Sequence, residues 1–426
     1  MGKAWCKERL LFLGAILFVV SMMCAVPVMG KEQVVLEFWH YWDGNNAKAA
    51  ETFAARYNQQ NPEVKVKPVF VSTGELLPKI QASVLAGKPP ALAIADIAWM
   101  GQLLRSGSLA PLDAYLKERK EDISDFYPSL LEYSRFEGKT LALPLTTNNL
   151  ALFYNKDLFR AAGLDPDRPP KTWDELVDYA KRLTKKDGSV YGFEMYSQLD
   201  ETGEGLTWNL QPYLWQAGAD FLIDNYTKPG FNNERGEKAL QFVVDLFQKH
   251  KVAGLARKDS FGKGQAAMVV NGPWMVGIWK SSVSFDFGTA PIPYPEWGQP
   301  ATNMGGEQIF VFKGDEKREK AAVDFVLWLT GTSNMIEWDK LTGALPVRAS
   351  VAKDPGYRRW LQETEPRLLT FVDQQRHAHA RPPIPQYPDC SLAFAREMEK
   401  AYYGRQSVKE ALANAEKALL GILKGK

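Results

Sequence analysis

Short apolar runs and stretches of helical periodicity alternate along the first part of the chain. Residues 34–38 predict a short strand that Gly44 ends, and apolar side chains then recur at helical spacing over residues 47–57. Alternation returns at residues 64–68, a helical stretch follows, and residues 91–96 are almost all apolar, which suits a strand covered on both faces. This order of strand, helix and strand predicts a layered α/β domain with a largely parallel sheet.

The pattern changes in the middle of the chain. Gly138 and Pro144 bracket one extended segment, and residues 150–154 predict another. The segment TWDELVDYAKRL then has helical periodicity, with Thr172 as the N-cap and Glu175 three residues later as the second half of a capping box. A chain of 426 residues with 45% hydrophobic residues can bury a large core, and we expect two domains. Further helices are predicted at residues 237–249, 317–329 and 408–423.

The N-terminus has the charge order of a secretory signal. Three basic residues precede an apolar run over residues 10–23, which is too short to span a bilayer as a mature helix, and the small residues of AVPVMG follow. We therefore predict a signal peptide at residues 1–30, cleavage before Lys31 and a periplasmic protein. Lipid modification of Cys24 is the alternative, which the preceding SMM fits poorly.

Removal of this signal leaves a formally neutral chain, because residues 1–30 carry three of the 52 basic and one of the 50 acidic residues. Neither nucleic acid nor an anionic membrane surface is an expected partner, since no basic stripe is present. Cys390 is the one cysteine of the mature chain, so we expect no internal disulfide. No later segment is long enough for a membrane span, and we expect a monomer.

Motifs for catalysis, cofactors and metals are weak. GKGQAAM at residues 262–268 has the spacing of a dinucleotide fingerprint, but a strand-like run follows where that fingerprint needs a helix. His377 and His379 lie two residues apart, which places them on different faces of a helix, and no metalloprotease pattern accompanies them. We therefore expect no cofactor, no metal and no enzyme, although a pair of glycosidase carboxylates stays open.

Aromatic residues stand beside polar ones at several predicted element ends. In open α/β sheets, ligands bind in the crevice outside the carboxyl ends of the strands. Flat aromatic faces bind the C–H surfaces of sugar rings, and carboxylates and amides bond the hydroxyls, so this composition suits a carbohydrate or polyol. The residues concerned are Trp42, Asp43, Asp96, Trp99, Trp208, Tyr213, Trp215, Asn271 and Trp274.

Four segments carry a family resemblance over nearly all of the mature chain. They are ALFYNKDLFRAAGLDPDRPPKTWDEL after Leu150, FGKGQAAMVVNGPW ending at Trp274, GALPVR at Gly343 and GRQSVKEAL at Gly404. In this order they resemble the periplasmic solute-binding proteins of ABC importers for sugars, with the maltose-binding and glycerol-3-phosphate-binding proteins as relatives. The resemblance implies capture of a carbohydrate or polyol outside the inner membrane and delivery to the transmembrane subunits of an ABC permease.

The resemblance also implies the fold. It is α/β with two lobes, each a mainly parallel sheet flanked by helices, and crossing hinge strands join the lobes, which close on ligand. The implied lobe limits are residues 31–146 and 292–342 for the first lobe, and residues 147–291 and 343–426 for the second. The implied crossings lie near residues 143–147, 288–293 and 342–345.

The predicted ligand-binding residues would line the cleft between these lobes. Trp274 matches the cleft tryptophan of the maltose-binding relative, whereas Ser391 stands about where that relative has its other stacking tryptophan, which argues against maltose. In the segment FWHYWDG, we expect the phenylalanine to anchor the first strand and the YWD residues to point toward ligand. The full predicted set is Tyr41, Trp42, Asp43, Glu75, Asp96, Asn148, Trp208, Trp274, Gly305, Gly306 and Arg381.

Arg381 bears on the choice of ligand. Glu75, Asn148 and Arg381 fall where the glycerol-3-phosphate relative has a Glu, a Ser and an Arg that touch ligand, but Ala344 replaces its ligand-contacting Tyr. A dianion in a closed cleft needs more than one donor group. We therefore predict that the ligand is a neutral carbohydrate and that Arg381 donates to its hydroxyls. Glycerol 3-phosphate is the alternative. A secreted glycan-cleaving enzyme is the further alternative, since it would share the export signal, the neutral charge and the aromatic cleft.

Overall fold

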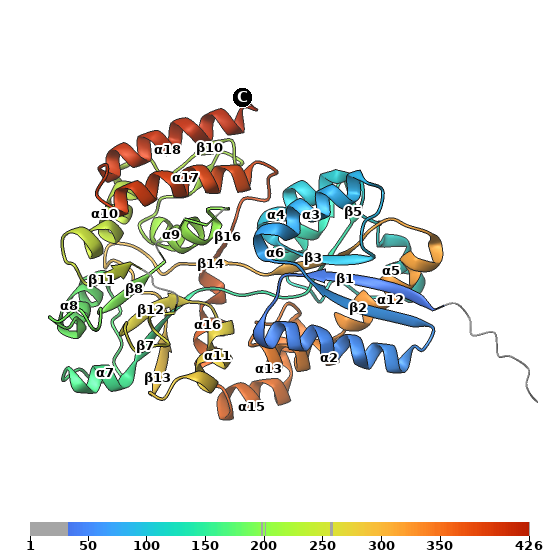
Figure 1. Cartoon of the computed structure of the whole chain (residues 1–426), viewed down its shortest axis with the longest axis horizontal. Helices are drawn as coiled ribbons and strands as arrows, with labels where there is room; N and C mark the ends of the chain where they lie inside the picture. The colour runs from blue at the N-terminus through green and yellow to red at the C-terminus, as the bar shows by residue number, and fades with distance from the viewer. Residues whose placement is uncertain (1–32, 197–198, 201, 256–258, 426) are drawn as a thin grey trace, which may run out of the picture.

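The chain forms two α/β lobes joined by extended segments, as Figure 1 shows for the computed structural model. The structure describes residues 33–425 apart from residues 197–198, 201 and 256–258. The two-lobed α/β fold is confirmed. The predicted signal peptide, together with Cys24 and Lys31, lies outside the described residues.

The first lobe is built on a five-stranded sheet in the order β2-β1-β3-β15-β6. Both β2 and β3 pair with β1 in parallel, whereas β15 is antiparallel to β3 and to β6. The strands are β1 (Val34–His40), β2 (Val64–Phe70), β3 (Leu92–Asp96), β6 (Leu143–Pro144) and β15 (Glu307–Val311). The helices of this lobe are α2 (Gly44–Gln60), α3 (Thr73–Leu85), α4 (Ile97–Leu103), α5 (Asp113–Arg119), α6 (Pro128–Leu131), α12 (Glu316–Leu329), α13 (Thr332–Thr342) and α14 (Ala349–Lys353).

The second lobe has its own five-stranded sheet, in the order β11-β8-β12-β7-β13. Here β8 pairs with β11 and β12 in parallel, and β7 is antiparallel to β12 and β13. The strands are β7 (Ala151–Asn155), β8 (Phe193–Met195), β11 (Ala253–Leu255), β12 (Met268–Asn271) and β13 (Phe287–Ala290). The helices are α7 (Lys156–Ala161), α8 (Trp173–Leu183), α9 (Glu204–Gln216), α10 (Glu234–Gln248), α11 (Trp274–Ser282), α17 (Tyr387–Tyr402) and α18 (Val408–Leu423).

Both sheets are more mixed than the sequence predicts. The antiparallel members β7 and β15 enter their sheets directly from the other lobe, without the helical crossover that a parallel neighbour needs. The periodicity of a strand carries no information on its direction, so the sequence does not predict that β7 and β15 are antiparallel to their neighbours.

Three extended passages join the lobes and pair with one another. The first passage runs from β6 to β7, and Asn148 forms a bridge with Gly305 of the second passage, which leads from β13 to β15. The second passage contains β14 (Thr302–Met304), which is parallel to β16 (Ala378–Ala380) in the third passage. Helices α15 (Pro355–Glu363) and α16 (Leu369–Gln374) precede β16, and α17 follows it.

Two of the predicted crossings overlap these passages in part, since residues 291–293 follow β13 and Leu345 forms a bridge with Thr147 of the first passage. Gly288 belongs to β13 inside the second sheet, where a Cβ would lie 2.5 Å from the Tyr154 ring, so this glycine serves packing rather than a hinge. Gly343 has a φ of +76° and caps the end of α13. Beyond it the chain stays on the first lobe, because the Arg348 guanidinium lies 3.1 Å from the Glu121 carboxylate. The chain contacts the second lobe again before β16, where Arg367 Nε donates to the carbonyl oxygen of Phe287 in β13 at 3.1 Å. The lobe limits stay a prediction.

Several helices begin where the sequence predicts. The Thr172 hydroxyl accepts a hydrogen bond from the backbone N–H of Glu175 at 3.1 Å, but the Glu175 carboxylate turns to the N–H of Lys171 instead of closing the capping box. The complete capping box is at the start of α18, between Ser407 and Glu410. The helices predicted at 237–249, 317–329 and 408–423 are confirmed as α10, α12 and α18.

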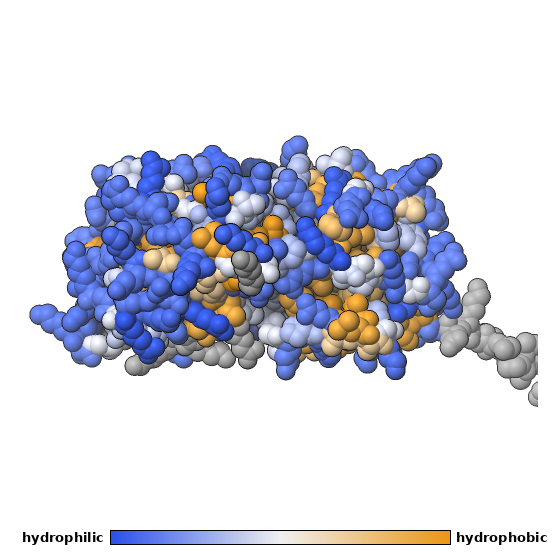
Figure 2. Space-filling view, turned by 90° about the horizontal axis from the view of Figure 1, so that it is seen from above, coloured by the Kyte–Doolittle hydropathy of each residue, from blue (hydrophilic) through white to orange (hydrophobic). Residues whose placement is uncertain are grey.

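The surface seen from above the view of Figure 1 is mainly hydrophilic, with scattered apolar areas (Figure 2). Phe70 and Leu85 are among the large apolar side chains exposed on the first lobe. Cys390 is free and buried in α17. Within the described part of the chain, no helix combines the length and the apolar content needed to cross a membrane.

Candidate ligand-binding site

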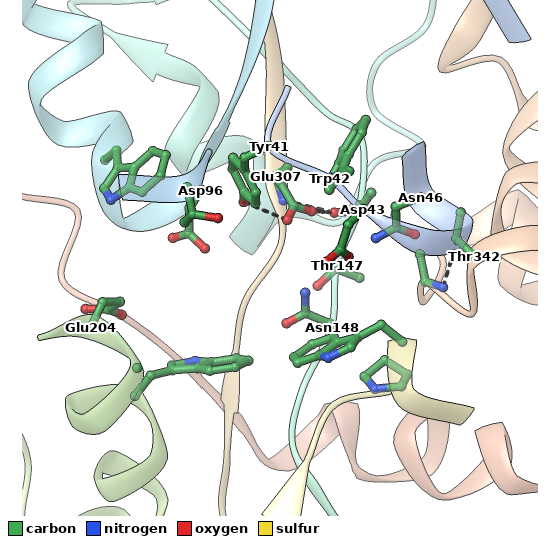
Figure 3. A pocket seen from close by; sticks show the side chains of 18 of the residues that line it. Tyr41, Trp42, Asp43, Asn46, Asp96, Thr147, Asn148, Glu204, Glu307 and Thr342 are labelled. Atoms are coloured by element: carbon green, nitrogen blue, oxygen red, sulfur yellow. Dashed lines mark hydrogen bonds between the residues drawn. The ribbon is translucent and has the colours of Figure 1, made fainter. Parts of the chain in front are cut away.

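A cavity of about 380 Å³ lies between the lobes. The first lobe contributes the turn after β1, the end of β3 and the start of β15, and the second contributes the first turns of α9 and α11. Figure 3 shows Tyr41, Asp96 and Asp43 on one side of the open space, with Glu204 and Asn148 on the other. The lining residues are Tyr41, Trp42, Asp43, Asn46, Thr73, Asp96, Trp99, Thr146, Thr147, Asn148, Asp200, Thr202, Glu204, Gly205, Trp208, Pro273, Trp274, Glu307, Thr342, Ala344 and Arg381.

Two indoles from the second lobe form one wall of the cavity. The rings of Trp208 and Trp274 are nearly parallel, at 18°, with centroids 5.9 Å apart, and both are half-buried. Gly272 permits the position of Trp274, since a Cβ there would lie 2.0 Å from the indole. Gly305 does the same for Trp208, whose ring would be 3.0 Å from a Cβ. The two glycines therefore keep the indoles close to the backbone, which leaves the space in front of them free.

The first lobe presents a buried acid next to an aromatic pair. The Tyr41 hydroxyl donates to the Glu307 carboxylate at 2.8 Å, and the Thr146 hydroxyl donates to the other oxygen of the same carboxylate. Burial raises the pKa of the Glu307 carboxyl above its ordinary value, and the two hydroxyls oppose that rise. Trp99 meets the Tyr41 ring edge to face, with centroids 5.6 Å apart. These contacts hold Tyr41 in one orientation at the cavity wall.

Arg381 joins the two lobes through a buried pair of ionic contacts. Its guanidinium is 2% exposed, with Nη2 lying 2.8 Å from Asp96 Oδ1 and Nη1 lying 2.6 Å from Glu204 Oε1. The Ser391 hydroxyl donates to Glu204 Oε2 at 2.6 Å, and the Tyr387 hydroxyl donates to Oε1 at 3.2 Å. Burial raises the pKa of the Glu204 carboxyl, while the Arg381 charge acts in the opposite direction. Two carboxylates thus share the positive charge of this arginine.

Some buried polar atoms of the cavity lining have no partner among the described residues. They are the indole Nε1 of Trp42 and of Trp208, the side-chain oxygen of Asn148, and Nε and Nη2 of Arg381, of which Nη2 keeps its ion pair with Asp96. Buried donors and acceptors are normally hydrogen-bonded, because leaving one unpaired costs about 1–3 kcal/mol. Several donors and one acceptor are thus available for a ligand that can both accept and donate, as a hydroxyl does.

The sequence profile of the family described as bacterial extracellular solute-binding protein matches residues 43–336. The chain belongs to this family. Members are the solute-binding components of ABC importers for sugars and glycerol phosphates, so the predicted function class is confirmed. The family is one of substrate-binding proteins, not of enzymes.

Similar proteins bind different solutes. The sn-glycerol-3-phosphate-binding periplasmic protein UgpB of Escherichia coli strain K12 is 26% identical over 427 residues, covering 93% of this chain and 94% of that protein. The crystal structure of the cyclic alpha-maltosyl-1,6-maltose binding protein from Arthrobacter globiformis is 42% identical with a TM-score of 0.81, covering 92% of this chain and 100% of the other. A solute-binding protein from Thermotoga lettingae bound with alpha-D-tagatose is 26% identical, with a TM-score of 0.82 and coverage of 92% and 100%.

Most of the residues predicted for this solute-binding protein meet at the cavity. Their contact with a ligand stays a prediction. Trp42 lines the cavity although it is only 3% exposed, because its ring also packs against Trp338 at a centroid distance of 5.2 Å. Phe38 is fully buried and anchors β1 as predicted. The predicted residues that line the cavity are Tyr41, Trp42, Asp43, Asp96, Asn148, Trp208, Trp274 and Arg381.

Three predicted residues do not line the cavity. Glu75 is exposed on the first turn of α3, where its carboxylate accepts a hydrogen bond from the Ser72 hydroxyl at 2.7 Å. Gly305 and Gly306 lie in the second passage between the lobes. Gly306 has a φ of +133°, and a Cβ there would lie 2.2 Å from the carbonyl oxygen of Thr146. These glycines position neighbouring side chains and strands, so their effect on the site is indirect.

Sequence reasoning missed three carboxylates that line the cavity, those of Asp200, Glu204 and Glu307. Glu204 precedes Trp208 by four residues and thus lies on the same face of α9, a spacing that could have revealed it once Trp208 was chosen. Glu307 pairs with Asp96 across two antiparallel strands far apart in the sequence, and no local signal marks that contact. Of the two histidines considered for metal binding, His379 stacks on Trp215 at 4.8 Å. Among the described residues, no cluster of three or more potential ligands could hold a metal ion.

Proposed function

We propose that this solute-binding protein captures a neutral carbohydrate outside the inner membrane and delivers it to the transmembrane subunits of an ABC permease. The proposal is carried by the parallel indoles of Trp208 and Trp274 in a cavity lined by carboxylates and amides. Aromatic faces take the C–H faces of sugar rings, and the polar groups bond the hydroxyls. A cavity of about 380 Å³ falls within the size range of small-molecule sites.

The unpartnered polar atoms support a polyhydroxylated ligand. A hydroxyl can accept from Trp208 Nε1 or Arg381 Nε and can donate to the Asn148 oxygen, so a single sugar ring can satisfy more than one of these atoms. We propose ligand contacts for the cavity-lining members of the predicted set. These are Tyr41, Trp42, Asp43, Asp96, Asn148, Trp208, Trp274 and Arg381.

The similar proteins guide the choice of carbohydrate. Because the 42%-identical protein from Arthrobacter globiformis is a cyclic alpha-maltosyl-1,6-maltose binding protein, we place this saccharide and linear gluco-oligosaccharides first in a ligand panel. The 26%-identical UgpB keeps sn-glycerol 3-phosphate as the alternative ligand. The carboxylates of the cavity, which include Asp43, Asp96, Glu204 and Glu307, disfavour this anion.

The protein is proposed to act as a periplasmic monomer without catalytic activity. Its family is one of binding proteins, and proteins such as UgpB of Escherichia coli are periplasmic. Capture and release then need only a ligand-dependent shift between an open and a closed arrangement of the lobes.

A thermal-shift screen over mono-, di- and oligosaccharides and sn-glycerol 3-phosphate tests the proposal. A ligand at about 100 times its Kd should add roughly 2.7 kcal/mol to the free energy of unfolding. Titration calorimetry then gives the affinity, and mass spectrometry of the recovered saccharide should show it unchanged. A response to sn-glycerol 3-phosphate with none to any saccharide would refute the neutral-ligand proposal, and cleavage products would refute the non-catalytic one.

A further inference from the structure

The fork formed by Nη1 and Nη2 of the Arg381 guanidinium faces two carboxylates. A phosphate or carboxylate binds arginine best through two parallel hydrogen bonds from one edge of the planar group. Here Nη1 donates to Glu204 at 2.6 Å, and Nη2 lies 2.8 Å from Asp96 Oδ1 in an ion pair without a hydrogen bond, so each terminal nitrogen lies against a carboxylate. Nε has neither an ion pair nor a hydrogen bond, and its N–H suits a hydroxyl oxygen.

The local charge also opposes an anion. Asp96 and Glu204 carry two formal negative charges against the one positive charge of Arg381, so the buried cluster as a whole is negative. Arg381 is the basic side chain among the described lining residues, which also include Asp43, Asp200 and Glu307. A phosphate group entering the cavity would therefore meet carboxylates without an uncompensated cation to balance them.

Glu204 is itself fixed in its position. Ser391 donates to its second carboxylate oxygen at 2.6 Å, and Tyr387 donates to the oxygen that faces Arg381 at 3.2 Å. Asp96 is held from the other lobe, where its Oδ1 accepts the backbone N–H of Ala98 at 2.7 Å as the N-cap of α4. A phosphate would have to displace an anchored carboxylate to reach the arginine fork.

We propose that Glu204 and Asp96 determine ligand charge specificity: they occupy the fork of Arg381 and make the cleft reject phosphorylated ligands while it admits uncharged ones. This inference rests on the proposed function, in which the cleft binds solute. It assigns a role to two carboxylates that act on ligand through Arg381.

The test measures binding of sn-glycerol 3-phosphate and of inorganic phosphate by titration calorimetry. The parent protein should show no heat of binding up to about 1 mM of either compound, which corresponds to a free energy of binding weaker than about 4 kcal/mol. The double variant Glu204→Gln with Asp96→Asn keeps the side-chain shapes and removes both negative charges that face Arg381, so a phosphate can displace the more weakly held amide oxygens from the fork. It should gain phosphate affinity by at least tenfold, and added salt should weaken that binding.

Two further variants separate the fork from the general charge of the cleft. Asp43→Asn removes one carboxylate that also lines the cavity but has no ion pair with Arg381, and it should gain much less phosphate affinity than the double variant. Adding Arg381→Ala to the double variant should abolish the gain. If Glu204→Gln prevents folding, Asp96→Asn alone should still produce part of the gain, because it removes one of the two negative charges that face Arg381.

Two results would overturn the proposal. One is micromolar binding of sn-glycerol 3-phosphate by the parent protein, and the other is a folded double variant that binds phosphate no better than Asp43→Asn does. Because these readouts use phosphate compounds alone, they do not depend on which saccharide the ligand panel identifies. A saccharide panel without any response, together with a gain of phosphate binding in the double variant, would refute the neutral-ligand proposal and leave the fork assignment standing.

Discussion

Replacement of Trp274 by alanine tests the indole wall directly. The Trp274 ring is half-buried, is held over Gly272 and lies parallel to Trp208 at 5.9 Å, so it can form a rigid face for a sugar ring. Truncating a well-packed aromatic anchor costs about 1–3 kcal/mol of binding free energy. At about 1.4 kcal/mol for each tenfold change, the Kd should rise roughly 5- to 150-fold.

The companion substitution Trp208→Phe separates the contribution of the indole N–H to ligand affinity from that of the aromatic ring. Phenylalanine keeps a flat ring but removes the Nε1–H that has no partner among the described residues. If that N–H donates to a ligand hydroxyl, its loss should cost about 0.5–1.5 kcal/mol, a change in Kd of roughly 2- to 12-fold. Trp208→Ala should cost more, because it also removes the ring that lies 5.7 Å from the guanidinium carbon of Arg381.

Trp297→Ala is the matched control. This tryptophan is 57% exposed, and its ring packs outside the cavity against Trp173 of α8 at a centroid distance of 5.8 Å. Titration calorimetry with the saccharide from the panel should give the parent affinity for this variant, and thermal melts should show that all variants fold. An unchanged Kd in a folded Trp274→Ala protein, or an equal loss in Trp297→Ala, would refute the assignment of the indole wall.

Three other predictions concern stability, motion and processing. Burial raises the pKa of the Asp339 carboxyl well above its ordinary value, so the folded state keeps this proton at pH values where the unfolded chain has lost it. The free energy of unfolding therefore falls as the pH rises above about 4. Asp339→Asn removes this pH dependence, so the Tm of the variant relative to the parent should increase from about pH 4 to pH 7, and a constant difference would contradict the prediction. A saturating ligand should lower the radius of gyration in small-angle scattering, and an unchanged curve would count against closure of the lobes. Intact-mass measurement of exported protein should show an N-terminus at Lys31, whereas a lipid-modified Cys24 would contradict the predicted cleavage.

Local patterns predicted the elements of the fold better than their arrangement. The apolar run at residues 91–96 became β3, and the helical periods near residues 237 and 317 became α10 and α12, because burial of one face needs only nearby residues. In the sheet, β15 lies between β3 and β6, but in the sequence the strands of the second lobe separate it from both. No periodicity within β15 specifies its neighbours or its direction, so the mixed sheet could not be predicted.

The glycines illustrate a second limit. Gly288, Gly305, Gly306 and Gly343 were interpreted as hinge or site residues, but each has a different local cause in the structure. A Cβ at Gly288 or Gly305 would meet a neighbouring side chain, whereas Gly306 and Gly343 have positive φ values of +133° and +76°. The same residue type therefore serves packing in two places and backbone conformation in two others, and sequence alone does not separate these demands.

Arg381 shows why a correctly predicted cleft residue does not by itself determine the identity of the ligand. Its position suggested a choice between phosphate and sugar hydroxyls, and that choice depends on how many of its N–H groups are available. Glu204, which is 177 positions away in the sequence, accepts from Nη1, and Asp96, which lies on the other lobe, forms an ion pair with Nη2. An arginine whose charge is shared by two anchored carboxylates can donate to a neutral ligand through Nε, but it cannot compensate a dianion unless a carboxylate is displaced. The carboxylates around Arg381 thus favour a neutral carbohydrate more strongly than the arginine itself favours an anion.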